Sequence, residues 1–296
     1  MANNQLAQKP KFSTMIKSTV YQELIKQTLS DQKKVERYTA AIMSAVATNP
    51  ALQECEAKTI LSGSLLAESL NLAHSPQLGQ YYLVPFKNKK AGTTEAAFIL
   101  GYKGYLQLAI RSGNYRKINV MEIKDGELVS FNPFDEEIVL KPIQDVDERE
   151  AAKTIGYYAM FEYTNGFKKT IYWSKNQMLK HADRYSAAFS VNATSGRYPK
   201  VSFEDYEAGR YDKNDEWLYS SYWYKDFDGM AKKTMLRQLI SKWGIMSVDM
   251  QQAFTFDNAV TGISDGVFEV ADSPEEELQE APKEQEAPKA VSIDDI

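Results

Sequence analysis

Apolar residues recur at three- and four-residue spacings through the first 75 positions, which is the period of an amphipathic helix. The pattern predicts helices over residues 15–29, 35–47 and 60–72, and the Asn49-Pro50 pair ends the second of them. From there the period shortens, and brief apolar runs flanked by turn residues predict strands at 81–86, 96–100, 118–123 and 137–140.

The strongest local signal is a pair of β-rich runs, residues 155–164 and 167–173, that flank Asn165-Gly166. An Asn-Gly pair readily adopts the two positive φ angles that a tight hairpin turn requires. The sequence therefore predicts an antiparallel hairpin with its turn at these two residues.

The rest of the core is expected to be a long polar loop over residues 186–215 and a helix over 216–243 that Gly244 ends. Helices first, a central antiparallel hairpin or sheet, and helices last indicate an α+β fold. We expect a core over residues 1–262, with a helical part (1–75) and a sheet-and-helix part (76–262). Residues 263–296 are rich in Glu, Pro, Ala and Gln and are expected to form a disordered acidic tail.

Composition excludes several classes of protein. The 296 residues include one Cys and two His, which argues against disulfides and against zinc or histidine-based metal sites. No run of apolar residues is long enough to cross a membrane, and residues 1–11 are polar and lack a signal core. The expected location is the cytoplasm, with no membrane partner.

The net charge of −5 hides a strong asymmetry. Residues 265–296 hold eleven acids and two bases, so the remainder of the chain is mildly basic. Its bases are clustered: residues 87–124 contain eight bases and two acids, and residues 229–244 contain four bases and no acid. Because salt screens charges beyond roughly 8–10 Å, such clusters attract phosphates even in an acidic protein.

Catalytic signatures are weak. No phosphate-binding glycine loop of the G-x-x-x-x-G-K-[ST] or G-x-G-x-x-G type occurs, so an ATP site is not expected. Neither His74 nor His181 has an obvious nucleophile nearby, and the acids around Cys55 disfavour its thiolate. The acidic groups at 135–137 and at Asp226 and Asp228 fit solvated loops better than a magnesium site. The pattern favours a binding protein without a covalent catalytic site.

Two predicted helices carry cations in a stripe. If residues 102–111 are helical, Lys103, Gln107 and Arg111 lie four apart on one side, with Tyr105 and Tyr115 nearby to stack on bases. In residues 230–244, Lys233 and Arg237 form a second stripe, beside a face that is expected to be buried and comprises Leu236, Leu239, Ile240 and Trp243.

Cations that follow phosphates and aromatic faces that accept any base are what sequence-tolerant binding of single strands requires. We expect the two stripes to converge into one basic groove. Such a groove would leave base edges free, so that a second strand could test for complementarity.

Four segments, in this order, resemble the RecT family of phage and prophage single-strand annealing recombinases. They are residues 100–111, residues 119–128, the hairpin that ends at Tyr172-Trp173, and residues 230–244. The resemblance spans about residues 78–250 and departs from the family at 186–215, which is longer than usual. It implies a core similar to that of Red beta, with a sheet and helices forming a basic groove.

The resemblance further implies annealing of complementary DNA strands without ATP or another cofactor. It implies homo-oligomeric rings or helical filaments that hold single-stranded and annealed duplex DNA. The host single-stranded-DNA-binding protein and a 5′→3′ exonuclease are the other partners that it suggests. Carried over by position, the DNA-binding residues would be Lys103, Tyr105, Gln107, Arg111, Tyr115, Lys117, Lys232, Lys233, Arg237 and Lys242.

Two alternatives stay open. The acid groups could serve a metal-dependent nuclease, or the chain could be an adaptor that binds the host strand-coating protein and barely touches DNA. The acidic tail could shield the basic groove or bind a partner.

Overall fold

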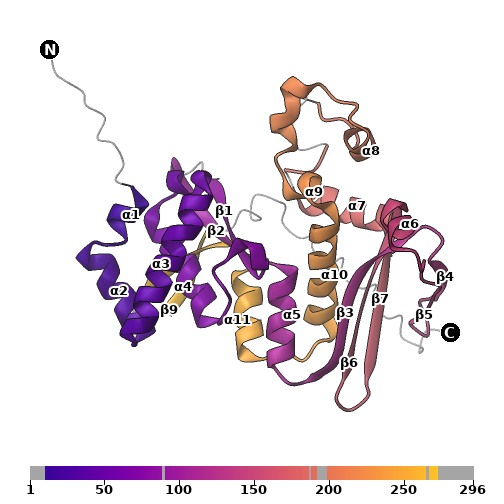
Figure 1. Ribbon diagram of the computed structural model, residues 1–296, viewed down its shortest axis with the longest axis horizontal. Coiled ribbons are helices and arrows are strands. Elements are labelled where there is room, and N and C mark those ends of the chain that lie inside the picture. Colours follow the sequence, from indigo (N-terminus) through magenta and orange to yellow (C-terminus); the bar gives the residue numbers. More distant parts are fainter. Residues whose placement is uncertain (1–10, 89–90, 187, 192–198, 265–266, 273–296) are drawn as a thin grey trace, which may run out of the picture.

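The structure is a computed structural model that describes residues 11–88, 91–186, 188–191, 199–264 and 267–272. Helices from the N-terminal part surround a four-stranded sheet, and a three-stranded sheet lies at the opposite end (Figure 1). Three helices occupy the space between the two sheets. The α+β class predicted from the sequence is confirmed.

The N-terminal helices are α1 (Phe12–Met15), α2 (Thr19–Leu29), α3 (Gln32–Thr48) and α4 (Ala57–Ser69). The first predicted helix is thus split in two, because Ser18 is extended and begins α2. The side chain of Asp31 caps α3 by accepting from the amides of Lys33 and Lys34. Pro50 ends that helix by starting the short 3-10 helix η1 (Pro50–Glu54). Helix α4 is buried on most of its circumference, which makes it the central helix of this half.

The first sheet has the order β1-β2-β8-β9 and is antiparallel throughout. Its strands are β1 (Tyr81–Asn88), β2 (Thr93–Leu100), β8 (Ala259–Ser264) and β9 (Val267–Asp272). Helix α4 packs against β2 and β8. The predicted end of the core at residue 262 therefore falls inside β8, and ordered strands continue to Asp272. Residues 273–296 of the expected tail lie outside the described residues.

The second sheet contains the predicted hairpin. It has the order β3-β6-β7, with β3 (Tyr115–Lys124), β6 (Thr154–Tyr163) and β7 (Lys168–Ser174). Gly166 has a φ of 88°, and the Asn165 side chain accepts from the amide of Phe167 at 3.0 Å. The turn is therefore where the Asn-Gly pair predicted it, but only Gly166, and not Asn165, has the positive φ that was expected of both. A small hairpin, β4 (Leu128–Asn132) and β5 (Glu137–Leu140), and helix α6 (Val146–Ala151) precede β6.

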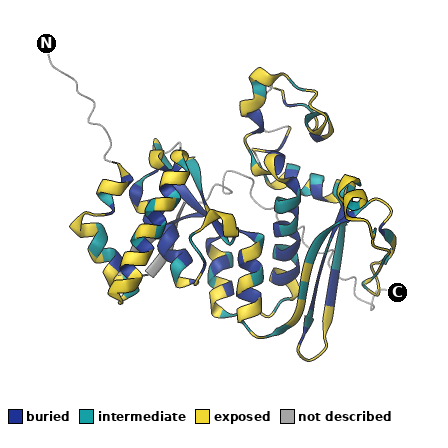
Figure 2. Ribbon diagram, in the orientation of Figure 1, coloured by how far each residue is buried: buried dark blue, intermediate teal, exposed yellow. Residues whose placement is uncertain are grey.

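The helices between the sheets are α5 (Tyr102–Arg111), α10 (Phe227–Trp243) and α11 (Val248–Phe256), with α7 (Lys175–Tyr185) following β7. Helix α10 packs against α5 on one side and against β3, β6 and β7 on the other. Its Leu236 and Ile240 belong to the first core, and its Met235 and Leu239 belong to the second. Figure 2 shows this burial along α10 and the adjoining strands. Of the face predicted to be buried, only Trp243 is not, being 51% exposed.

Gly244 ends α10 as predicted, but for a different reason. Its φ is −82°, so no left-handed residue is needed there. A Cβ at this position would lie 2.6 Å from the carbonyl oxygen of Ile240 and 2.7 Å from the hydroxyl of Tyr115. Glycine is required because the chain passes these atoms too closely for a side chain.

The stretch expected to be a long polar loop is partly structured. It contains α8 (Phe203–Glu207) and leads into the 3-10 helix η3 (Lys213–Tyr219) and α9 (Tyr222–Lys225), beyond the N-terminal end of α10 (Figure 1). Aromatic rings form its core, among them Phe189, Phe203, Tyr206, Tyr219 and Tyr224. The helix predicted over 216–243 is interrupted at Asp226, whose carboxylate caps α10 by accepting from the amide of Gly229. None of the described helices has both the length and the apolarity to cross a bilayer.

Candidate nucleic-acid interface

Helix α5 begins where two glycines allow the chain before β1 to approach it closely. A Cβ on Gly101 would lie 2.1 Å from the carbonyl oxygen of Gly79, and a Cβ on Gly104 would lie 2.1 Å from that of Gln80. Gly79 itself has a φ of 62°, in the left-handed region that favours glycine. These glycines fix the segment leading into β1 against the first turn of α5.

The cationic stripe predicted on α5 exists. Lys103 and Gln107 are exposed, with Arg111 following one turn later. The Arg111 guanidinium donates to the carbonyl oxygens of Leu70 and Asn71, at 3.0 Å for Asn71. It thereby satisfies the carbonyls at the C-terminal end of α4, so Arg111 has a structural role as well as an exposed position.

The predicted residues on α10 have a different environment. Lys233 Nζ lies 3.0 Å from Asp257 Oδ1, and Arg237 Nη1 lies 2.8 Å from Asp257 Oδ2. The Tyr105 hydroxyl donates to the same carboxylate at 2.7 Å. We call Asp257, Tyr105, Lys233 and Arg237 the Asp257 cluster. Lys233 and Tyr105 are buried, and Arg237 is half-buried.

Tyr105 therefore has no exposed ring face on which a base could stack in this structure. Burial raises the pKa of its hydroxyl, and the charge of Asp257 raises it further. Lys233 is likewise buried and paired with the Asp257 carboxylate. The four-residue spacing of Lys233 and Arg237 reflects a shared buried partner that the sequence pattern does not reveal.

The two stripes do not form one groove within the chain. Tyr105 is two residues from both Lys103 and Gln107, which places it about 200° away around α5 at 3.6 residues per turn. Lys103 and Gln107 thus project away from Asp257, whereas Lys233 and Arg237 point toward it. The expectation of a single groove that joins both stripes is not met inside one molecule.

Lys232 lies on the side of α10 that faces β3. Its Nζ is 3.4 Å from Glu122 Oε2 and 5.5 Å from the centroid of the Tyr102 ring, at the start of α5. Burial alone would raise the pKa of Glu122, but hydrogen bonds and the charge of Lys232 lower it overall. Lys232 therefore lies close to the start of α5 as well as to β3.

Three residues that the sequence did not single out lie in the same region. Tyr82 on β1 and Tyr222 on α9 are exposed, with ring centroids 6.4 Å apart. Lys225 Nζ is 5.9 Å from the centroid of the Tyr222 ring. Tyr82 is the second residue of β1 and Tyr222 is the first residue of α9, so no local periodicity could have indicated the group.

The remaining predicted residues are scattered. Lys117 and Lys242 are exposed on β3 and near the end of α10. Tyr115 is half-buried, donates its hydroxyl to the carbonyl oxygen of Ile245 at 2.9 Å, and packs edge-on against Phe161. Like Tyr105, it is placed to hold the core together.

Helix α7 adds Arg184 to the predicted cations Arg237 and Lys242 of α10. Burial and the charges of these three cations together lower the pKa of His181 to about 4. These three cations therefore surround His181 closely enough to disfavour a fourth positive charge. The imidazole lies between the Trp173 and Tyr185 rings, at centroid distances of 5.3 and 4.6 Å.

The acids considered for a metal site have protein partners. Glu136 pairs with Lys169, Asp135 accepts from Asn132, Asp228 accepts from the Tyr157 hydroxyl at 2.6 Å, and Asp226 caps α10. Within the described ranges, no group of three or more His, Cys, Asp or Glu residues could hold a metal ion.

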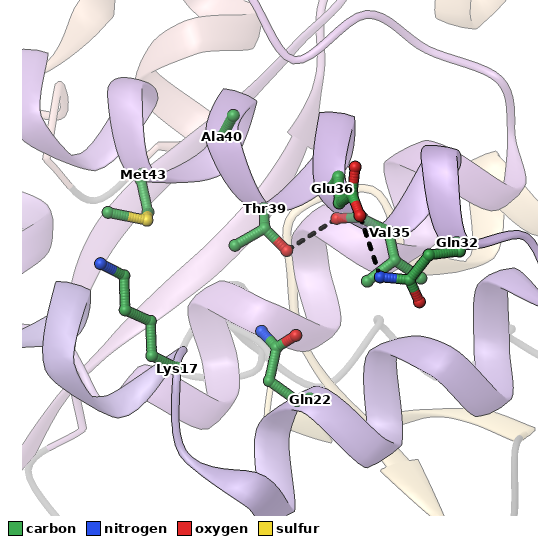
Figure 3. A pocket seen from close by; sticks show the side chains of 8 residues that line it. All are labelled: Lys17, Gln22, Gln32, Val35, Glu36, Thr39, Ala40 and Met43. Atoms are coloured by element: carbon green, nitrogen blue, oxygen red, sulfur yellow. Dashed lines mark hydrogen bonds between the residues drawn. The ribbon is translucent and has the colours of Figure 1, made fainter.

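Two surface hollows do not suit a nucleic-acid backbone. One of about 560 Å³ lies among the N-terminal helices, with Lys17 and Glu36 among its lining residues (Figure 3). Another of about 730 Å³, between α6 and α9, is lined by four lysines and five carboxylates. One of those lysines, Lys175, is already paired with Glu207 at 3.0 Å. The exposed side of α5 and its surroundings are therefore the better candidate.

Comparison with known proteins gives three findings. The model of the RecT family matches residues 36–275. The chain is 37% identical to an uncharacterized protein, YqaK of Bacillus subtilis (strain 168), over 75% of this chain and 63% of that protein. The match therefore spans less than two thirds of the length of YqaK. The chain is also 25% identical to Protein RecT of Escherichia coli (strain K12), over 80% of this chain and 81% of that protein.

Proposed function

The chain belongs to the RecT family, and we propose that it is a DNA recombination protein that binds single-stranded DNA and anneals complementary strands. Binding uses the phosphate backbone and needs no ATP. Base pairing with the second strand supplies the specificity. Because annealing makes and breaks no covalent bond, no covalent catalytic site is required.

One observation carries this proposal: the exposed Lys103 of α5 and the half-buried Lys232 of α10 occur beside a group of tyrosine rings. Lys103 follows Tyr102, whose ring lies 5.5 Å from Lys232 Nζ, and Tyr82 and Tyr222 lie close by. Phosphate contacts position a strand without reading its sequence. A strand held in this way keeps its base edges available to a complementary strand.

In this proposal the protein acts as a homo-oligomer, in a ring or helical filament, and successive subunits bind the same DNA strand. The two cationic stripes do not join within one chain. In an oligomer, the stripes of neighbouring subunits could join into a continuous basic track. The host single-stranded-DNA-binding protein and a 5′→3′ exonuclease are its proposed protein partners.

The test is annealing of two complementary oligonucleotides with EDTA present and no nucleotide. We expect the protein to accelerate pairing, and binding to weaken steeply with salt because phosphate contacts release counterions. Lys103→Glu should weaken both. Lys34→Glu, which changes an exposed lysine on α3, is the matched control and should leave them unchanged.

Other outcomes identify the alternatives. Strand cleavage that appears only with Mg²⁺ or Mn²⁺ would indicate a nuclease. Normal recombination in cells despite charge reversal at Lys103 and Lys232 would indicate an adaptor.

A further inference from the structure

The surface beside the α5 cations contains a pair of exposed aromatic rings. Of the two tyrosines that the sequence suggested for stacking, Tyr105 is buried and Tyr115 is half-buried. Tyr82 and Tyr222 remain 36% and 50% exposed. Exposed aromatic rings beside cations are the combination that binds unpaired nucleic-acid bases.

The two rings form one aromatic surface. Their centroids are 6.4 Å apart and their planes differ by 34°, within the range of interacting aromatic pairs. Burial raises the pKa of Tyr82, and so does its proximity to Tyr222, Asp226 and Tyr102. The third tyrosine therefore lies next to the pair, and all three rings come from different elements.

Lysines border this surface on several sides. Lys225 lies over the Tyr222 ring, and Lys232 lies over the Tyr102 ring. A Cβ on Gly79 would meet both the Tyr82 hydroxyl, at 3.0 Å, and Cδ of Lys103, at 3.5 Å. Lys103 and Tyr82 thus approach the same glycine. Acids lie nearby as well: Glu122 is paired with Lys232 at 3.4 Å, and the carboxylate of Asp226 is engaged at the start of α10.

We infer that Tyr82 and Tyr222 form a stacking site for an unpaired nucleobase, with Lys103 and Lys225 placed to contact the phosphates beside it. The inference rests on the proposed function and specifies how single strands are distinguished from duplex. In a duplex the bases already stack on one another inside the helix, so their faces are not available to the tyrosines. The site holds a strand before pairing and releases the base when pairing occurs.

The position of the pair depends on close backbone packing. Gly79, Gly101 and Gly104 allow the start of β1 to lie against α5, which brings Tyr82 beside Lys103. A short helix, α9, carries Tyr222 and Lys225 together. Gly101 and Gly104 thereby help to position the stacking site through backbone packing, and the proposal assigns them no phosphate contact.

The test compares strands with and without bases. Tyr82→Ala and Tyr222→Ala are measured for binding to an oligonucleotide and to an abasic oligonucleotide of equal length. Because stacking on one ring contributes roughly 1–3 kcal/mol, each change should weaken binding of the ordinary strand by roughly 5- to 150-fold. Binding of the abasic strand should be unchanged.

Matched variants separate stacking from misfolding. Tyr82→Phe and Tyr222→Phe keep the ring and should bind like the parent protein. Phe134→Ala removes a ring that is 93% exposed on the β4–β5 turn, and it should have no effect. A 2-aminopurine base in the strand reports stacking directly, since its fluorescence is quenched on an aromatic ring.

Equal loss on both strands, or no loss on the ordinary strand, would overturn the stacking site. If the parent protein anneals strands while the alanine variants bind normally, only this inference fails. If the parent protein binds no single-stranded DNA, the proposed function fails and the stacking site with it.

Discussion

Replacing Asp257 by alanine should be among the most destabilising single changes in the protein. Its carboxylate is fully buried and accepts from four donors: the Leu100 amide at 2.9 Å, Tyr105 at 2.7 Å, Lys233 at 3.0 Å and Arg237 at 2.8 Å. Together these bonds join β2, α5 and α10 to the turn between α11 and β8.

The magnitude follows from what the change leaves behind. The Lys233 side chain is only 8% exposed, so without Asp257 its charge stays buried beside no carboxylate of this cluster. Removing one partner of a buried ion pair typically costs about 3–5 kcal/mol. Because domains are stable by about 5–15 kcal/mol in total, Asp257→Ala removes a large part of the stability.

The assay is equilibrium unfolding in urea, followed by circular dichroism. Lys233→Met should cost less than Asp257→Ala, because Asp257 keeps Arg237, Tyr105 and the Leu100 amide. Adding Lys233→Met to Asp257→Ala should restore part of the stability by removing the unpaired charge. Glu23→Ala, at an exposed position on α2, is the control. A loss below about 1 kcal/mol for Asp257→Ala, or no recovery in the double variant, would refute this reasoning.

Three further changes test other parts of the structure. Gly104→Ala should destabilise by about 1–3 kcal/mol in thermal unfolding, because its Cβ would overlap the Gln80 carbonyl; a gain in stability would contradict the close packing. The low pKa of His181 means that the unfolded chain binds a proton which the folded chain rejects, so stability should fall as pH drops from about 6.5 to about 4. His181→Gln should reduce the change of the urea unfolding midpoint between pH 6.5 and pH 4. A variant with the same pH dependence as the parent protein would argue against a lowered pKa of His181. Lys103→Gln should lower the salt slope of single-strand binding by roughly 0.7, the value for one phosphate contact, and an unaltered slope would remove Lys103 from the interface.

Local patterns predicted those elements whose stability is local. The Asn165-Gly166 hairpin and helix α5 follow from turn chemistry and from the spacing of apolar residues. Strands β8 and β9 were not predicted, because β8 is placed by pairing with β2 far away in the sequence. The polar loop was wrong for a related reason: its aromatic residues have no helical period and form a core only in three dimensions.

The candidate site shows the same division. The stripe of Lys103 and Gln107 was predicted because four-residue spacing identifies one side of a helix. Lys233 has the same spacing from Arg237, yet its partner Asp257 lies 24 residues away and makes it a core residue. Tyr82 of β1 and Tyr222 of α9 are far apart in the sequence and become neighbours only in the folded chain, which no local pattern encodes.

The pairing of β8 with β2 has a consequence for how the chain is made. Phe98 of β2 pairs with Ala259 of β8, so the first sheet is incomplete until most of the chain has been synthesised. At roughly 5–20 residues per second, the ribosome needs about ten seconds or more between the two strands. During that interval Tyr105, and later Lys233, lack the Asp257 carboxylate to which they donate hydrogen bonds in the complete fold. The N-terminal half is thus exposed to chaperones and proteases, without its completed sheet, until β8 has been synthesised.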